Sequence, residues 1–226
     1  LVDMEMVQFH PSGMVKPEEI AGTLVTEAVR GEGGILLNNK GERFMKNYDK
    51  DRMELSTRDK VAMANYTEIL QGRGTDNEAV YLDISHKDKD FIIKKIPTIY
   101  RQFLELQNLD ISEKPMEVAP TAHYSMGGIL LNASDHSTDV NGLFAAGEVA
   151  AGLHGANRLG GNSLAEILVF GKRVGEASVR YSRKLNLEFD YSNMFKKASK
   201  NIERFIKKGS LRPNFLQERL RDIMWH

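Results

Sequence analysis

The chain has 226 residues, of which 41% are hydrophobic and 27% are charged, with 31 basic and 31 acidic side chains. This balance is typical of a globular protein with an ordinary core, and it provides no overall basic field that would favour nucleic acid. The absence of cysteine excludes disulfides, a thiolate nucleophile and iron–sulfur ligation by this chain. No apolar run approaches the ~20 residues that a membrane-spanning helix needs.

The two ends indicate an internal piece of a longer protein. The first residues, LVDMEMVQFH, begin inside an apolar, strand-like stretch without a preceding leader. Near the other end, Leu216, Leu220 and Ile223 form a helical stripe that no C-terminal signal closes. We therefore expect a segment before Leu1 that contributes to the same functional site.

Hydrophobic periodicity and turn residues predict eight elements in the first 182 residues. In chain order they are a helix over 17–30, a hairpin over 34–44, a helix over 57–71, a strand over 79–85, helical residues 89–107 interrupted at Pro97, a strand with glycines over 117–132, a short buried strand over 142–148, and a long helix over 163–182. The short, buried strand 142–148 is of the parallel-sheet type that is typical of the α/β fold class.

The predicted strand 142–148 ends in Gly147 and Glu148, followed by a glycine-rich turn. Ligands of open α/β sheets lie beyond the carboxyl ends of the strands, where an acid can accept hydrogen bonds from sugar or ribityl hydroxyls. The simpler alternative is a strand-end carboxylate that caps the next loop.

The stretch HGANRLGGNSLAE leads into the long helix. Asn162 and Ser163 are suitable N-cap residues, and the glycine Gly161 allows close backbone approach. The amides of Ser163 and Leu164 would then form an anion site at the positive end of the helix dipole. A capped helix start is the plainer interpretation, but Arg158 favours an anion site because a guanidinium suits bidentate recognition of a carboxylate.

Two charged residues lie where local rules disfavour them. Glu27 falls on the apolar stripe of the predicted helix 17–30, so we expect a buried carboxylate that needs a partner. Arg58 lies in the first turn of its helix, where the dipole disfavours a cation by ~0.3–1 kcal/mol, and on the face that points inward. These exceptions indicate a functional site, although Glu27 and Arg58 could also form only a structural ion pair.

Two histidines occur in similar settings, His10 in QFHPSG and His123 in PTAHYSMGG. Each follows an apolar or proline-led strand and precedes a glycine-rich turn, where a lone histidine is more often structural than a ligand. Neither histidine has a second ligand at metal-binding spacing, so we expect no metal site.

These residues carry a family resemblance. The motifs QFHPSG, TEAVRGEGGIL, STRDKVA, PTAHYSMGGI, GLFAAGE and HGANRLGGNSLAE resemble, in order and spacing, the succinate dehydrogenase/fumarate reductase flavoprotein family. The resemblance runs from residue 1 to about residue 180, and LQERLRDIMW more weakly resembles the start of that family's C-terminal helical domain. The family's amino-terminal GxGxxG segment is absent here.

The resemblance implies a Rossmann-like FAD-binding domain interrupted by an α+β capping domain that closes over a dicarboxylate. On this chain the FAD-binding portions would be residues 1–11 and 122–185, and the capping domain residues 12–121. Residues 186–226 would begin the helical domain. The implied cofactor is FAD.

The resemblance also assigns roles to individual residues. The substrate carboxylates would be held by His10, Thr26, His123 and Arg158, with a backbone contact from Gly161. Arg58 would donate or accept the substrate proton, and Glu27 would relay it. The flavin would contact Glu148, Asn162, Ser163 and Leu164, and hydride would pass at flavin N5.

The implied activity is the interconversion of succinate and fumarate, with electrons exchanged through a partner iron–sulfur subunit. The protein would be cytoplasmic and attached peripherally, at the inner face of the membrane, through partner subunits. Two alternatives remain open. The segments YLDIS and PTIYRQFLEL look closer to L-aspartate oxidase, a sister enzyme. The chain by itself could also be a non-catalytic fragment that needs its missing FAD-binding segment.

Overall fold

The computed structural model describes residues 1–185, 191–206, 209 and 211–225. It divides into two compact units, Leu1–Ser182 and Arg183–His226. The second unit contains α7 (Tyr191–Ile206) and α8 (Pro213–Trp225). The predicted domain boundary at residues 185 and 186 falls next to residues 186–190, which lie outside the described residues.

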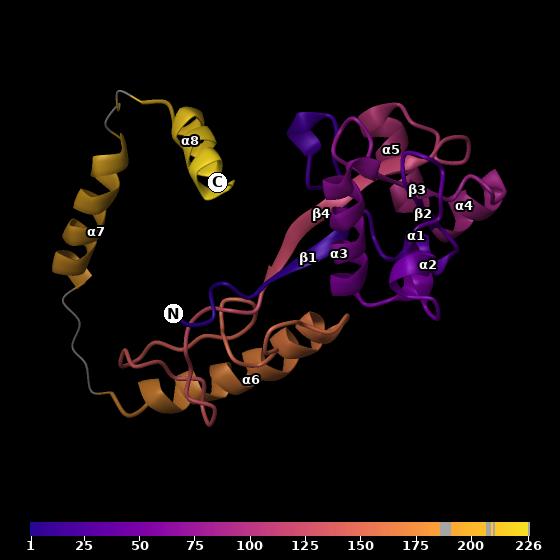
Figure 1. The fold of residues 1–226 in the computed structure, drawn as a ribbon. Coiled ribbons are helices and arrows are strands. Elements are labelled where there is room, and N and C mark those ends of the chain that lie inside the picture. Colours follow the sequence, from indigo (N-terminus) through magenta and orange to yellow (C-terminus); the bar gives the residue numbers. More distant parts are fainter. Residues whose placement is uncertain (186–190, 207–208, 210, 226) are drawn as a thin grey trace. The chain divides into compact units, whose positions relative to one another are not determined.

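The first unit is built on one open, antiparallel sheet. Its strands are β1 (Val7–Met14), β2 (Ile35–Leu37), β3 (Val80–Asp83) and β4 (Met116–Ser125), in the order β1-β4-β3-β2. Figure 1 shows that β1 and β4 form a long pair that extends beyond the shorter strands. The chain is therefore a mixed helix–strand protein with a single open sheet among the described residues.

The helices of the first unit are mostly short. They are α1 (Ala28–Gly31), α2 (Met45–Tyr48), α3 (Arg58–Glu68), α4 (Lys89–Lys95), α5 (Pro97–Gln107) and α6 (Asn162–Ser182), with 3-10 turns at Glu18–Ile20 and Met53–Leu55 and a π-turn at Ile69–Arg73. The predicted helices over 57–71 and 163–182 are confirmed as α3 and α6. The predicted interruption at Pro97 is also confirmed, since proline fits the first turn of α5 but cannot continue α4.

The hydrophobic core lies between the sheet and the helices of residues 14–118. It includes Leu36 and Leu82 from the sheet and Ile99 and Phe103 from α5, all 4% exposed or less. Ile99 and Phe103 are four residues apart, so they share one face of α5. The helix ends at Asn108, whose left-handed backbone (φ 50°) stops it.

The predicted helix over 17–30 is wrong. Only Glu18–Ile20 and Ala28–Gly31 are helical, and the residues between them run alongside β1. Gly22, with φ at +86°, turns the chain so that the Met14 amide donates to the Thr23 carbonyl and the Val25 amide to the Ser12 carbonyl. Hydrogen bonds to a neighbouring strand thus replace those of a helix.

The predicted buried strand over 142–148 is also wrong for the described chain. A strand needs neighbours for its peptide groups, and this segment makes only the single bridge between Ser137 and Phe144. Leu143 is 45% exposed, and α6 after it exposes Leu164 and Leu168 by 66% and 74%. The long helix is present, and although Ala177 is buried, most of its large aliphatic side chains are exposed in the described structure.

Candidate functional site

A bulge in the β1–β4 pair brings the two candidate histidines together. Gln8 pairs with Tyr124 and Phe9 with Ala122, so His123 is an extra residue in β4. Bulges of this kind redirect a side chain. The ring of His123 meets that of His10 edge to face, with centroids 5.4 Å apart.

The environment of both histidines disfavours their charged forms. His10 is buried, and its Nδ1 accepts a hydrogen bond of 3.3 Å from the Ser12 amide. Burial, with the nearby cations Arg58 and Arg30, lowers the pKa of His10 to about 4. Burial followed by the proximity of Arg58 also lowers the pKa of His123. Both rings are therefore neutral near pH 7 in the absence of a bound anion.

Glu27 and Arg58 form an ion pair, with Arg58 Nε donating to Glu27 Oε1. Glu27 is the residue before α1, and Arg58 opens α3 behind the N-cap residue Thr57. The side chain of Glu27 is 42% exposed, so the expectation of a buried carboxylate was wrong, because the helix on which it rested does not form. The hydrogen bond from Arg58 lowers the pKa of Glu27.

A second arginine adjoins this pair. Arg30 Nη2 lies 3.7 Å from Glu27 Oε1, and its Nη1 donates to the Glu54 carbonyl. The side chain is almost fully buried, and burial lowers its pKa. Sequence reasoning missed Arg30, although its place three residues after Glu27, within one helical turn, was a usable signal.

Arg158 is buried and contacts only neutral groups. Its Nη2 donates to Gln8 Oε1 at 2.9 Å, its Nη1 donates to the Leu159 carbonyl at 3.2 Å, and its guanidinium carbon lies 4.3 Å from the centre of the Tyr124 ring. Its Nε has no partner, and it forms no ion pair with any described residue. Burial, followed by the proximity of Arg58, lowers the pKa of Arg158.

Gln8 connects the two arginines that the sequence singled out. Its Oε1 accepts from Arg158 Nη2 and, at 3.4 Å, from Arg58 Nη1. Its Nε2 donates to Asn157 Oδ1 and to the Arg158 carbonyl, each at 2.6 Å. Sequence reasoning missed Gln8, although it lies two residues from His10 and so shares a strand face with it.

We refer to seven residues as the site cluster. They are Gln8, His10, Glu27, Arg30, Arg58, His123 and Arg158. The predicted glycine loop adjoins this cluster, since a Cβ placed on Gly160 would lie 4.0 Å from Arg58 Nη2.

The structure does not bring every predicted residue into this cluster. Thr26 precedes Glu27, but its side chain is exposed, and within the described part of the chain its Oγ1 accepts only from the Ala28 amide, at 3.4 Å. Gly161 has φ at +83°, and a Cβ placed on it would meet no described atom within 4 Å. Among the described residues, neither position forms a hydrogen bond with a side chain of the site cluster.

The start of α6 carries the other predicted residues. The helix begins at Asn162, the Leu164 amide bonds weakly to the Gly161 carbonyl at 3.3 Å, and the Ser163 amide makes no backbone hydrogen bond to a described residue. Glu148 is exposed, and its Oε1 accepts from the Ser125 amide at 2.9 Å. Its Oε2 has no partner in the described part of the chain.

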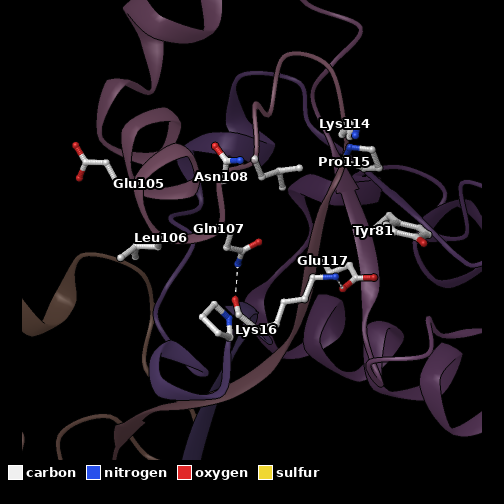
Figure 2. Close-up of a pocket in the computed structure, with 11 residues that line it drawn as sticks. Lys16, Tyr81, Glu105, Leu106, Gln107, Asn108, Lys114, Pro115 and Glu117 are labelled. Atoms are coloured by element: carbon white, nitrogen blue, oxygen red, sulfur yellow. Dashed lines mark hydrogen bonds and ion pairs between the residues drawn. The ribbon is translucent and has the colours of Figure 1, made fainter.

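A cavity of about 780 Å³ lies away from these residues (Figure 2). It is bordered by the end of α5 and by Lys16, which pairs with Glu117 at 2.6 Å and accepts through its carbonyl from Gln107 Nε2. None of the predicted site residues lines it. Because it lacks both the histidines and the arginines, we place the candidate site at the site cluster instead.

Metal-binding clusters and membrane-spanning helices are both absent from the part of the chain that the structure describes. Its residues contain no group of three or more His, Cys, Asp or Glu side chains that could hold a metal ion. None of its helices combines the length and the apolar character needed to cross a bilayer.

Comparison with known proteins gives several matches. The family described as FAD binding domain matches residues 1–164. One subunit of the CoM/CoB fumarate reductase of Methanothermobacter marburgensis is 51% identical over 225 residues, covering 100% of this chain and 40% of the relative. The flavoprotein subunit of the 8-methylmenaquinol:fumarate reductase of Wolinella succinogenes is 51% identical over 185 residues, covering 80% of this chain and 29% of the relative.

A solved structure of an E. coli quinol fumarate reductase variant matches with a TM-score of 0.78 and 37% identity. The match covers 93% of this chain and 38% of that chain. The chain thus spans 40% or less of the length of the two curated relatives.

Proposed function

The chain belongs to the FAD-binding flavoprotein family of succinate dehydrogenases and fumarate reductases, and we propose that it carries the dicarboxylate site of an enzyme that interconverts succinate and fumarate. The observation that carries this proposal is the charge of the site cluster. The cluster holds three arginines and one carboxylate, and Arg158 has no counter-charge among the described residues. A buried surplus of positive charge favours a dianionic ligand.

The ends of the substrate would be held by different parts of the chain. Arg158 and His123 would bind one carboxylate, with the unpartnered Arg158 Nε as an available donor. His10 and Thr26 would bind the other carboxylate, since the Thr26 hydroxyl can donate its proton to a carboxylate while its oxygen accepts from the Ala28 amide. Holding both ends would align the central carbon–carbon bond.

The residues at the start of α6 fit a flavin. The unused Ser163 amide and the adjoining residues Asn162 and Leu164 present the positive end of a 21-residue helix, which suits an electron-rich ring edge. Glu148 keeps one carboxylate oxygen available for ribityl or sugar hydroxyls. When bound there, FAD supplies two-electron redox chemistry at flavin N5.

Arg58 would donate or accept the proton at the second substrate carbon. A guanidinium is a poor acid, with a pKa normally above ~12, so this role needs nearby cations that destabilise its charged form. Arg158 shares the Gln8 amide oxygen with Arg58, and Arg30 lies against the same carboxylate. Glu27 would pass the proton onward through its hydrogen bond with Arg58, so the observed ion pair is compatible with a relay.

The electrons would reach or leave the flavin through a partner iron–sulfur subunit, as the family resemblance implies; this chain has no cysteine with which to hold such a cluster itself. We further propose that this assembly is cytoplasmic and peripheral to the membrane. The names of the relatives, which are flavoprotein subunits of fumarate reductases and succinate dehydrogenases, support a multi-subunit enzyme.

The test uses the full-length, flavin-loaded protein and measures oxidation of a reduced dye by fumarate. The Arg58→Lys variant is expected to lose about 10²–10⁴-fold in turnover, the range of general acid–base catalysis. Arg52→Lys is the matched control, because Arg52 is exposed and lies outside the cluster. Unchanged turnover in Arg58→Lys would contradict the proposed role of Arg58.

The same preparation separates the alternatives. Aspartate-dependent peroxide production without fumarate reduction would replace the proposal with L-aspartate oxidase activity. A colourless preparation of the 226-residue chain, beside a yellow full-length protein, would identify the chain by itself as a non-catalytic fragment.

A further inference from the structure

Three buried side chains form a hydrogen-bonded group behind Arg158. The hydroxyl of Tyr124, on β4, donates to Glu166 Oε2 at 2.7 Å, and His154 Nε2 lies 2.9 Å from the same oxygen. The Tyr124 and His154 rings also meet edge to face, with centroids 5.8 Å apart. Tyr124, Glu166 and the His154 side chain are 7%, 5% and 8% exposed.

The Tyr124 ring is the surface on which Arg158 rests. The guanidinium carbon lies 4.3 Å from the ring centre, within the range of a cation–π interaction. A ring face attracts a cation without using the N–H groups in the guanidinium plane. Nη1 and Nη2 each donate one hydrogen bond to a neutral oxygen, of Leu159 and Gln8, so the Nε–H and the second hydrogen of each Nη stay available for a carboxylate.

Other arginines of the molecule are held differently. Arg43 donates to both carboxylate oxygens of Glu54, and Arg73 donates to both of Glu68, with closest distances of 2.6 Å. In each case a carboxylate occupies the guanidinium edge and neutralises its charge. An incoming substrate carboxylate would have to displace such a partner, whereas Arg158 presents no competing carboxylate in the described chain.

Glu166 does not pair with Arg158 directly, because Tyr124 contacts both side chains, Glu166 through its hydroxyl and Arg158 through its ring. Its Oε2 is occupied by the Tyr124 hydroxyl and by His154, so Glu166 orients the ring instead of pairing with the arginine. Burial and the nearby Glu166 raise the pKa of Tyr124, which keeps the hydroxyl protonated and able to donate.

We propose that Tyr124, fixed in place by Glu166 and His154, is a positioning residue that holds Arg158 for a substrate carboxylate without supplying a counter-charge. This inference rests on the proposed dicarboxylate function. It predicts that loss of the ring weakens dicarboxylate binding, and that loss of the hydroxyl alone has a smaller effect.

The test measures binding of malonate, a dicarboxylate that cannot be oxidised to an alkene, through the change it causes in the flavin absorbance of the full-length protein. Tyr124→Leu is expected to raise the malonate dissociation constant by about 3–30-fold, the range of a cation–π interaction. Tyr124→Phe, which keeps the ring, is expected to recover most of that loss. KM for fumarate should rise in parallel in Tyr124→Leu while kcat stays within about twofold, since the interaction acts on the bound carboxylate in ground state and transition state alike.

Two further variants test the role of Glu166. Glu166→Gln keeps an oxygen acceptor for the Tyr124 hydroxyl and is expected to bind malonate as Tyr124→Phe does, or more tightly. Glu166→Leu removes the acceptor and should bind less tightly than Glu166→Gln. The control is Tyr181→Leu, which removes a tyrosine that packs on Phe144 and contacts no arginine of the site cluster.

The outcomes distinguish the inference from the function on which it rests. Flavin-loaded wild-type protein that fails to bind malonate would overturn both. Wild-type protein that binds malonate, beside an equally stable and flavin-loaded Tyr124→Leu variant with unchanged affinity, would overturn the positioning role alone. A fall in kcat with unchanged KM would also overturn it, because the ring would then act on another step.

Discussion

Two regions of the molecule differ in how far their apolar side chains and charged groups are buried and paired. We call residues 14–118 the core region and residues 122–182 the glycine-rich region. In the core region the large apolar side chains are packed, and the buried carboxylates of Glu54 and Glu68 each bind an arginine at two points. In the glycine-rich region α6 exposes much of its apolar surface, and the buried Arg158 has no carboxylate partner among the described residues. The buried carboxylates Glu54 and Glu68 are thus neutralised by arginines, whereas the buried Arg158, where we propose that a ligand binds, has no counter-charge among the described residues.

The largest effect that this comparison predicts concerns packing. Phe103→Ala, in the core region, is expected to lower the free energy of unfolding by about 3–5 kcal/mol, because Phe103 is fully buried. Leu168→Ala, on α6, should change it by about 0.5 kcal/mol or less, because Leu168 is 74% exposed. Urea denaturation of the 226-residue chain measures both values, and equal losses in the two variants would break the comparison.

The second prediction concerns a neutralised charge in the core region. The hydrogen bond from Arg73 is the main cause that lowers the pKa of Glu68 from 4.5 to about 2. A pKa lowered by folding contributes stability above pH 4.5, and that stability is lost as the pH falls towards 2. The expected loss is about 3 kcal/mol, at 1.36 kcal/mol for each pKa unit.

Unfolding measured between about pH 6 and pH 2 tests this expectation. In Glu68→Gln the contribution should be missing over the whole range, so that its stability changes less with pH than that of the wild type. Glu113→Gln, at an exposed position, should follow the wild-type curve. A Glu68→Gln curve parallel to the wild-type curve would refute the assignment to Glu68.

The third and smallest prediction concerns protons taken up with a ligand. Burial and the cations Arg58 and Arg30 hold the pKa of His10 near 4. A bound dicarboxylate would offset those cations and raise the pKa of His10, so binding should take up a fraction of a proton that grows from about pH 7 to pH 5. Binding should therefore strengthen as the pH falls.

Titration calorimetry of the flavin-loaded protein with malonate, in two buffers of different ionisation enthalpy, measures this uptake. His10→Gln should reduce it, whereas His86→Gln, at an exposed position, should leave it unchanged. Uptake of the same size in all three proteins would exclude His10 as its source.

The sequence predicted elements well where the local signal was strong. Pro97 correctly marked the start of α5 within the predicted helical residues 89–107. The segment 17–30 had the same helical spacing of apolar residues, but Gly22 allowed a turn that pairs the chain with β1 instead. Hydrophobic periodicity is a property of one segment alone. It therefore cannot show whether that segment forms a helix or instead pairs with another strand.

The candidate site shows the same limit. His10, Glu27, Arg58, His123 and Arg158 were selected from the sequence, and the structure brings them close together, while their roles stay predictions. The bulge that redirects His123 could not be predicted, because an extra residue in a strand is defined only by its partner.

The groups behind the site were missed for a different reason. Gln8, Tyr124 and Glu166 lie inside the family motifs, but no role was predicted for them, because their importance depends on which distant side chains they contact. A single sequence does not show which side chains that are far apart along the chain come into contact.

The pairing of Met14 with Val118 in adjacent strands means that the chain leaves β1 and returns to its neighbour β4 at adjacent positions, after residues 15–117 have added β3 and β2 to the other side of β4. A segment with such close ends can be lengthened, shortened or exchanged during evolution without pulling the flanking strands apart. Gln8, His10 and Tyr124 stand on those flanking strands, whereas Glu27, Arg30 and Arg58 stand on the segment between them. Recombination at this junction would therefore keep one side of the site cluster and replace the other.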